Sequence, residues 1–225
     1  MTHLIKSLHA CFILAVVGLA APAQASPSMQ TGRITSQPVG HYDFCQRHSA
    51  ECQPVKSMPP VSLTPDVWAT LVSVNNAVNT EIDQRTDMEV WGYEDYWEYP
   101  YNGAGDCEDL ALEKRKRLMD AGLPVSDLLI TVVRDEKGDG HAILTVRTDR
   151  GDFILDNMKP KIFRWDETPY TYLKRQSTEH AGRWVDIEGT GSPAIAAREV
   201  GRATATATAT SATARRNIVD IIMGR

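Results

Sequence analysis

Residues 103–124 read GAGDCEDLALEKRKRLMDAGLP and predict a helix with a cysteine in its first turn. Gly105 or Asp106 can cap the start of this helix, and residues 121–124 form a stop signal at its end. Cys107 therefore lies where free backbone N–H groups and the positive end of the helix dipole favour a thiolate. The same N–H groups can stabilise an oxyanion beside the sulfur, as a nucleophilic cysteine requires.

The acidic residues around this cysteine oppose its ionisation. Three of them lie within two positions of Cys107: Asp106, Glu108 and Asp109. Adjacent negative charges disfavour a thiolate, so a catalytic role needs a cation that offsets them. Two simpler interpretations stay open. The acids can complement the helix dipole, and the cysteine can be a small residue packed at a helix start.

Three β-rich runs separated by glycine turns follow the helix, at residues 128–134, 141–148 and 152–157. They predict an antiparallel meander. His141 begins the second run and Asp156 closes the third, so the meander brings the two residues to the same end of neighbouring strands. A turn centred on residues 148–149 would place them directly opposite each other. A turn centred on residues 150–151 would misalign them by several residues.

A thiol, an imidazole and a carboxylate form the nucleophile, base and orienting group of a covalent catalyst. Cys107, His141 and Asp156 supply these groups in order, on a helix and two strands. A histidine taken alone is more often structural, and His180 has no comparable strand context. The ordered set of three predicts an enzyme that works through a thioester on Cys107.

The N-terminus has the pattern of an export signal. Lys6 precedes an apolar run at residues 10–21 and a small-x-small cleavage motif at residues 23–25, which predicts a signal peptide over residues 1–25. The alternative is a retained membrane anchor, but the run is shorter than the ~20 residues that span a bilayer. We expect a periplasmic or secreted protein without stable membrane insertion after cleavage.

The remaining composition predicts one globular domain at residues 41–188. The chain has 225 residues, with 42% hydrophobic and 24% charged residues, an ordinary globular balance. Its formal net charge of −5 lacks the basic surplus of nucleic-acid-binding proteins, so no nucleic-acid partner is expected. Residues 26–40 are rich in Ser, Pro, Gly and Gln and predict a flexible segment. Residues 189–225 are low in complexity and predict a disordered tail.

Two further segments lie between the N-terminus and the cysteine helix. Thr64 as N-cap, Pro65 in the first turn and apolar residues at helical spacing predict a helix at residues 65–82. The aromatic-rich segment at residues 91–101 is predicted to be irregular. Its rings either line a peptide cleft or pack around the sheet.

Three cysteines remain after removal of the signal: Cys45, Cys52 and Cys107. In an exported protein, a close pair plus one distant cysteine predicts a disulfide between Cys45 and Cys52 and a free thiol at Cys107. The alternative is a Cys2His2 metal site completed by His41 and His48. Structural zinc sites usually combine two separated ligand pairs, and this segment is one short stretch.

These motifs resemble the signatures of the bacterial transglutaminase-like cysteine proteinases, with coverage from about residue 41 to 175. The likeness is carried by residues 105–109, 141–144 and 155–157, with support from the segments at 91–97 and 44–52. It implies an α+β, papain-like fold with the transglutaminase core, in which the nucleophile helix packs on an antiparallel β-sheet. It also implies that Cys107, His141 and Asp156 are nucleophile, base and orienter.

Within this family the chain is similar to the LapG-type periplasmic proteases. That branch cuts the N-terminal region of a large surface adhesin, needs calcium, and is sequestered by an inner-membrane receptor. Asp106 and Glu108 match calcium ligands there, and carboxylate oxygens suit Ca²⁺. The chain departs from the branch in its Cys45/Cys52 pair and its Ala/Thr-rich tail.

The resemblance implies an exported cysteine endopeptidase that acts on a surface or periplasmic protein. Two other functions use the same residues. An acyltransferase or amidase passes through the same thioester and differs in the acceptor. A non-catalytic periplasmic binding module would keep the fold without using the three residues for chemistry.

Overall fold

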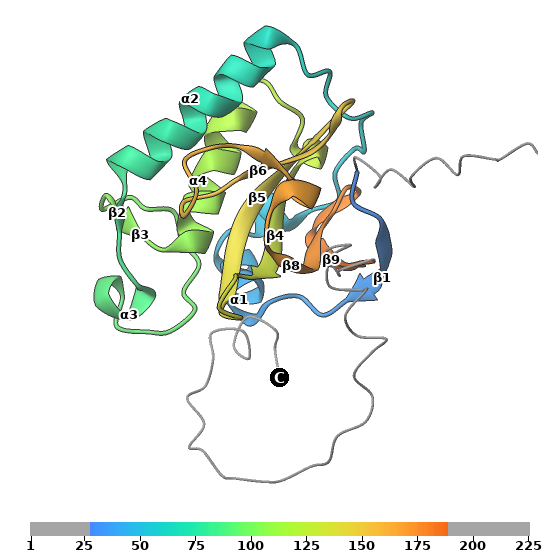
Figure 1. Ribbon diagram of the computed structural model, residues 1–225. Helices are drawn as coiled ribbons and strands as arrows, with labels where there is room; N and C mark the ends of the chain where they lie inside the picture. Colours follow the sequence, from blue (N-terminus) through green and yellow to red (C-terminus); the bar gives the residue numbers. More distant parts are fainter. Residues whose placement is uncertain (1–27, 189–225) are drawn as a thin grey trace, which may run out of the picture.

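A seven-stranded antiparallel sheet organises residues 28–188, the part of the chain that the computed structural model describes (Figure 1). The predicted signal peptide and the predicted tail at residues 189–225 lie outside the described residues. In spatial order the strands are β1 (Thr31–Thr35), β9 (His180–Ile187), β8 (Thr171–Ser177), β4 (Leu128–Arg134), β5 (Gly140–Thr148), β6 (Gly151–Leu155) and β7 (Phe163–Arg164).

The three predicted β-runs form the meander β4–β5–β6 at the centre of this sheet. The sequence therefore predicted the strands that carry His141 and Asp156, and it missed the four strands that extend the sheet on both sides. Two reasons explain the missed strands. Some pair with a segment that is distant in the sequence, as β1 does with β9, and the two-residue β7 is too short to show a periodic pattern.

The helices are α1 (Val39–Arg47), α2 (Pro65–Glu81), α3 (Asp87–Val90) and α4 (Cys107–Asp120), with short 3₁₀ turns at Ser49–Cys52, Val125–Asp127 and Trp165–Glu167. Two of the helices, α2 and α4, match the predicted positions, and α1 and α3 were not predicted. Thr64 caps α2 as expected, because its side chain accepts a hydrogen bond from the amide of Val67 at 3.2 Å. A small parallel pair, β2 (Asp83–Gln84) and β3 (Ala104–Gly105), joins the end of α2 to the start of α4.

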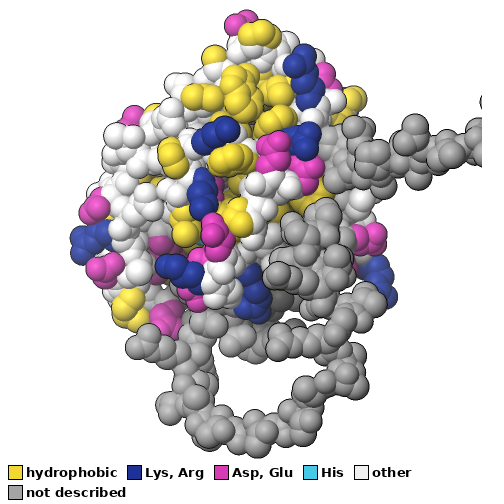
Figure 2. Space-filling view, in the orientation of Figure 1, with side chains coloured by type: hydrophobic (Ala, Val, Ile, Leu, Met, Phe, Trp, Pro, Cys, Tyr) yellow, Lys and Arg dark blue, Asp and Glu magenta, His cyan; other side chains and the backbone are white. Residues whose placement is uncertain are grey.

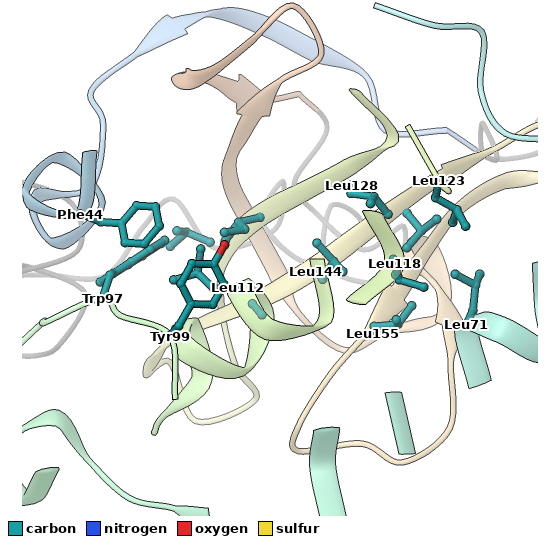
Figure 3. Packing of buried hydrophobic residues seen from close by; sticks show 14 of the residues in the cluster. Phe44, Leu71, Trp97, Tyr99, Leu112, Leu118, Leu123, Leu128, Leu144 and Leu155 are labelled. Carbon is teal, nitrogen blue, oxygen red and sulfur yellow. The ribbon is translucent and has the colours of Figure 1, made fainter. Parts of the chain in front are cut away.

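The nucleophile helix packs on the antiparallel sheet, as the resemblance implied. α4 contacts β4 and β5, and α2 packs on the other side of α4 (Figure 1). Leucines from α2, α4 and the sheet gather at one end of the main core (Figure 3). Burial of each such side chain contributes about 1.5–3 kcal/mol relative to exposure, so this contact fixes α4 against the sheet.

The prediction of a flexible segment over residues 26–40 is wrong for residues 31–35 and 39–40. Residues 31–35 form β1, and α1 begins at Val39. β1 pairs with β9, with Thr31 opposite Ile187 and Ile34 opposite Val185. The backbone partners of this strand lie about 150 residues away in the sequence, so the local composition could not reveal them.

The aromatic segment has two parts. Trp97 is 0% exposed and Tyr99 is 5% exposed, and both lie beside Phe44 in the core (Figure 3). These rings pack in the core and do not line a cleft. Tyr93 and Tyr101 are exposed. The structure assigns no helix or strand to residues 91–101, as predicted.

The disulfide prediction is confirmed. Cys45 at the end of α1 is bonded to Cys52 in the following 3₁₀ turn, and Cys107 is a free thiol. Because the two sulfurs are bonded to each other, they are not thiolate ligands. The alternative of a Cys2His2 metal site is therefore excluded. His48 instead bonds the carboxylate of Glu98, with 2.8 Å between Nε2 and Oε1.

Within residues 28–188, none of the helices has the length and apolar character needed to cross a lipid bilayer. On the face drawn in Figure 2, acidic and basic side chains are interspersed with hydrophobic ones.

Candidate active site

Cys107 is the first residue of α4, and the helix start lies against β5. Asp106 is the N-cap by position, but its side chain makes no capping hydrogen bond. The Cys107 sulfur accepts a hydrogen bond from the amide of Ala142 at 3.4 Å, and the thiol donates to Oε2 of Glu108 at 2.9 Å. The helix therefore brings the thiol to the residue that follows His141 on β5.

His141 and Asp156 are hydrogen-bonded, with 2.9 Å between Nε2 and Oδ1. In the register of β5 and β6, Leu144 lies opposite Leu155 and Thr148 opposite Gly151. The turn thus lies between the two positions considered from the sequence, and His141 and Asp156 are two residues away from direct opposition. They are diagonal neighbours on one face, a separation that long side chains can bridge.

Asp156 is 2% exposed and has three hydrogen-bond donors. Besides His141 they are the hydroxyl of Tyr170 and the amide of Met158, the latter at 2.9 Å. Burial acts to raise the pKa of Asp156, but the hydrogen bond and charge of His141 and the hydrogen bond of Tyr170 outweigh it and lower the pKa. The carboxylate is therefore held ionised beside the imidazole.

Tyr170 was not singled out from the sequence. It lies in the loop before β8, 14 positions after Asp156. Burial and the bond to Asp156 raise the pKa of its hydroxyl, which keeps it a donor. Nothing in the local pattern marks this tyrosine, because its role depends on the sheet that brings β8 beside the meander.

Nε2 of His141 bonds Asp156, so Nδ1 is the ring nitrogen that can take or give a proton. The imidazole is thus hydrogen-bonded to a buried, ionised carboxylate, and the Cys107 sulfur bonds the amide of Ala142, the residue next to His141. Burial raises the pKa of Cys107 well above its usual range, and the charges of Glu108 and Asp106 add to the rise. With these neighbours, the sulfur is therefore a protonated thiol.

The two carboxylates predicted as calcium ligands flank the thiol, and two further acids join them. Oxygens of Asp87, Asp106 and Asp109 lie within 4.8 Å of one another, as do the ligand atoms of Asp106, Cys107 and Glu108. Asp109 was noted only as an opposing charge. Asp87 on α3 was missed, since 20 residues separate it from Cys107 and no motif links them.

This acidic cluster has unsatisfied oxygens. Asp87 Oδ1, Asp106 Oδ1 and Asp109 Oδ2 are buried without a hydrogen-bond partner. Burial and then the charge of Asp106 raise the pKa of Asp87 to about 7 and that of Asp109 to about 9. The pKa of Glu108 is also well above its usual range, for the same two reasons. Bare oxygens of this type suit a hard cation, and without one the cluster retains protons at neutral pH.

A buried lysine also lies on the nucleophile helix. Lys114 is 1% exposed, two helical turns after Cys107. Side chains on a helix lean towards its N-terminus, which directs this lysine back towards the site. Burial lowers the pKa of Lys114 to about 7, while the charges of Asp156 and Cys107 act in the opposite direction. The sequence analysis did not identify this residue.

Residues 31–192 match a family model described as bacterial transglutaminase-like cysteine proteinase. No curated protein matches the chain. Among solved structures, calcium-bound LapG of Legionella pneumophila is 27% identical with a TM-score of 0.47, over 55% of this chain and 71% of that one. EGTA-treated LapG of the same organism is 29% identical with a TM-score of 0.46, over 55% of this chain and 69% of that one.

Proposed function

Because the chain belongs to the bacterial transglutaminase-like cysteine proteinases, we propose that it is an exported endopeptidase that cuts a protein substrate through Cys107, His141 and Asp156. Membership makes it a cysteine peptidase of the transglutaminase-like type. The observation that carries the residue assignment is the His141–Asp156 hydrogen bond of 2.9 Å beside the strand amide that bonds the Cys107 sulfur.

In the proposed reaction, Nδ1 of His141 takes the thiol proton while the sulfur attacks the carbonyl carbon of the scissile bond. Backbone N–H groups at the start of α4 stabilise the oxyanion that forms. His141 then gives its proton to the departing amine as the C–N bond breaks, which leaves a thioester on Cys107. Water attacks the thioester and gives its proton to His141, and the acid product and the thiol are released. Asp156 stays ionised and stabilises the imidazolium.

We include Ca²⁺ in this proposal, held by Asp106 and Glu108 together with Asp87 and Asp109. The unsatisfied carboxylate oxygens and raised pKa values of this cluster support it. A bound divalent cation supplies positive charge at the start of α4, which favours the thiolate over the thiol. Two carboxylates alone would be too few, because Ca²⁺ usually takes 6–8 oxygen ligands.

The proposed location is the periplasm or the cell exterior. The Cys45–Cys52 disulfide supports it, because such bonds form and persist in oxidising compartments, and the N-terminal signal pattern agrees. The proposed substrate is a large surface adhesin, and the proposed partner is an inner-membrane receptor that sequesters the enzyme. Both rest on the resemblance of the sequence to the LapG-type branch.

The proposal is tested by mapping new protein termini. Purified protein beginning at Ser26 is incubated with periplasmic and surface extracts, and a folded Cys107→Ala variant serves as the matched control. We expect new termini with the active chain and none with the variant. Equal cleavage by both would contradict the assignment of Cys107. Incorporation of an added labelled amine, without new termini, would favour the acyltransferase alternative.

A further inference from the structure

Two asparagine side chains attach the loop that follows β6 to α2. This loop, residues 156–162, begins with Asp156. Nδ2 of Asn79 donates to the backbone carbonyl of Asp156 at 2.7 Å, and Nδ2 of Asn75 donates to the carbonyl of Pro160 at 3.3 Å. Because the asparagines are four positions apart, they lie on the same face of α2. One helix therefore holds the loop at two points, its first residue and Pro160.

These amides occupy positions where polarity is costly. Asn75 is 0% exposed and Asn79 is half-buried, and the Oδ1 atom of each is buried without a hydrogen-bond partner. A buried acceptor without a partner destabilises the fold, and asparagine is a poorer helix former than leucine or alanine. An apolar residue would avoid both costs. In each amide, the group that makes a hydrogen bond is the N–H, which donates to a carbonyl of the loop.

The loop conformation sets the direction of the Asp156 carboxylate. Oδ1 of Asp156 accepts hydrogen bonds from the amide of Met158 and from His141, both at 2.9 Å. Any rotation of the backbone at residues 156–158 would move that amide and the carboxylate together. Asn79 binds the carbonyl within this segment and so opposes such a rotation. α2 also packs on α4, so the same helix supports the loop and the helix of Cys107.

We propose that Asn79, assisted by Asn75, is a positioning residue for the protease reaction. It fixes the carboxylate of Asp156 against His141 through the backbone of the loop and touches no reacting atom. This inference rests on the proposed catalytic role of Cys107, His141 and Asp156.

The test compares Asn79→Ala with Asn76→Ala, which removes an exposed asparagine from the same helix. A displacement of a catalytic group by ~1 Å can cost about 100-fold, so we expect kcat to fall about 10-fold or more in Asn79→Ala. KM should stay unchanged, because Asn79 does not contact the substrate. Asn79→Gln keeps an amide donor and should recover part of kcat. Asn76→Ala should match the parent protein in both constants.

A second readout separates positioning from general stability. The proton between Nε2 of His141 and Asp156 gives a downfield NMR resonance, which should shift in Asn79→Ala and stay in place in Asn76→Ala. Asn75→Ala should shift it less, because its bond lies four residues further along the loop. This variant keeps the test available if Asn79→Ala does not fold.

An unchanged kcat in folded Asn79→Ala, or a lower kcat with an unmoved resonance, would overturn the positioning role. The resonance is measured without substrate, so it still reports on Asn79 if the peptidase assignment fails. Failure of that assignment is recognised separately, by activity that persists in Cys107→Ala.

Discussion

Asp156 and Asp109 are buried to the same depth, at 2% and 0% exposure, yet their pKa values move in opposite directions. Burial raises both. At Asp156, hydrogen bonds from His141 and Tyr170 outweigh burial and lower the pKa. At Asp109, the charge of Asp106 adds to burial, and the pKa rises to about 9. The number of donors and the sign of the neighbouring charge therefore decide the ionisation of a buried carboxylate here, and depth alone does not.

The Asp156 region and the acidic cluster at the start of α4 therefore differ in how their buried carboxylates are stabilised. The carboxylate at the end of β6 has its donors within the fold and is ready to orient an imidazole. The acids at the start of α4 have fewer donors, because Asp109 accepts from the Glu98 amide at 2.8 Å but its other oxygen has no partner, and they need protons or a cation. The proposed chemistry depends on both regions, because the imidazole must be oriented and the thiol must ionise.

The largest expected effect is that of Asp156→Asn. The amide can donate to His141 and so favours the wrong tautomer of the imidazole. In a serine triad the same change costs about 10⁴-fold in kcat, and we expect a loss of this order here. Kinetics at saturating substrate measure it, with thermal unfolding as the control for folding. A variant within tenfold of the parent would show that Asp156 is not the orienting group.

Removal of calcium should reduce activity next most strongly. With bare carboxylates beside it, Cys107 has a raised pKa, and each unit of rise lowers the thiolate fraction about tenfold. We expect EGTA to suppress activity, added Ca²⁺ to restore it, and Asp106→Ala or Glu108→Ala to mimic the chelator. Calorimetry on the metal-free protein measures binding directly. If no Ca²⁺ binds and EGTA has no effect, the acids serve only to complement the helix dipole.

The stability of the metal-free protein should fall as pH rises. Asp87, with a pKa of about 7, and Asp109, with a pKa of about 9, bind protons more tightly in the folded chain than in the unfolded one, where the pKa is about 4. Their contribution to stability is complete below pH ~4 and is lost as pH rises through these values. Thermal unfolding in EGTA should therefore give a lower Tm at pH 9 than at pH 5.

Two controls belong to this pH experiment. Excess Ca²⁺ should reduce the difference in Tm between pH 5 and pH 9, because the cation replaces the protons. Asp87→Asn should also reduce it, since the amide does not titrate. A Tm in EGTA that does not change between these pH values would mean that the acids are satisfied in some other way.

Tyr170→Phe should have the smallest effect. It removes one of the donors to Asp156 and leaves His141 and the Met158 amide in place. A hydrogen bond to a charged group contributes about 1.5–3 kcal/mol, so we expect a loss of about 10–100-fold in kcat. The acidic limb of the pH profile should move to higher pH, because Asp156 becomes easier to protonate. If neither kcat nor the acidic limb of the pH profile changes, the hydrogen bond of Tyr170 does not help to keep Asp156 ionised.

The features that the sequence determined by itself are those that depend on neighbours within a few turns. The N-cap at Thr64, the stop signal after α4, the three strands of the meander and the Cys45–Cys52 pair follow from local patterns, and the structure confirms them. Capping, periodicity and close cysteine spacing act over short separations, so the chemistry of a few adjacent residues sets them.

The tertiary structure alone decided which distant residues meet. Nothing local marks β1 as the partner of β9, Asp87 as a neighbour of Asp106 and Asp109, Tyr170 as a donor to Asp156, or Asn79 as the support of its loop. The sequence predicted the meander but not the position of its turn, so the alignment of His141 with Asp156 was known only from the structure. These contacts join segments 14 to about 150 residues apart. They form only when the core has packed α2 and α4 on the sheet, and a local pattern carries no record of that packing.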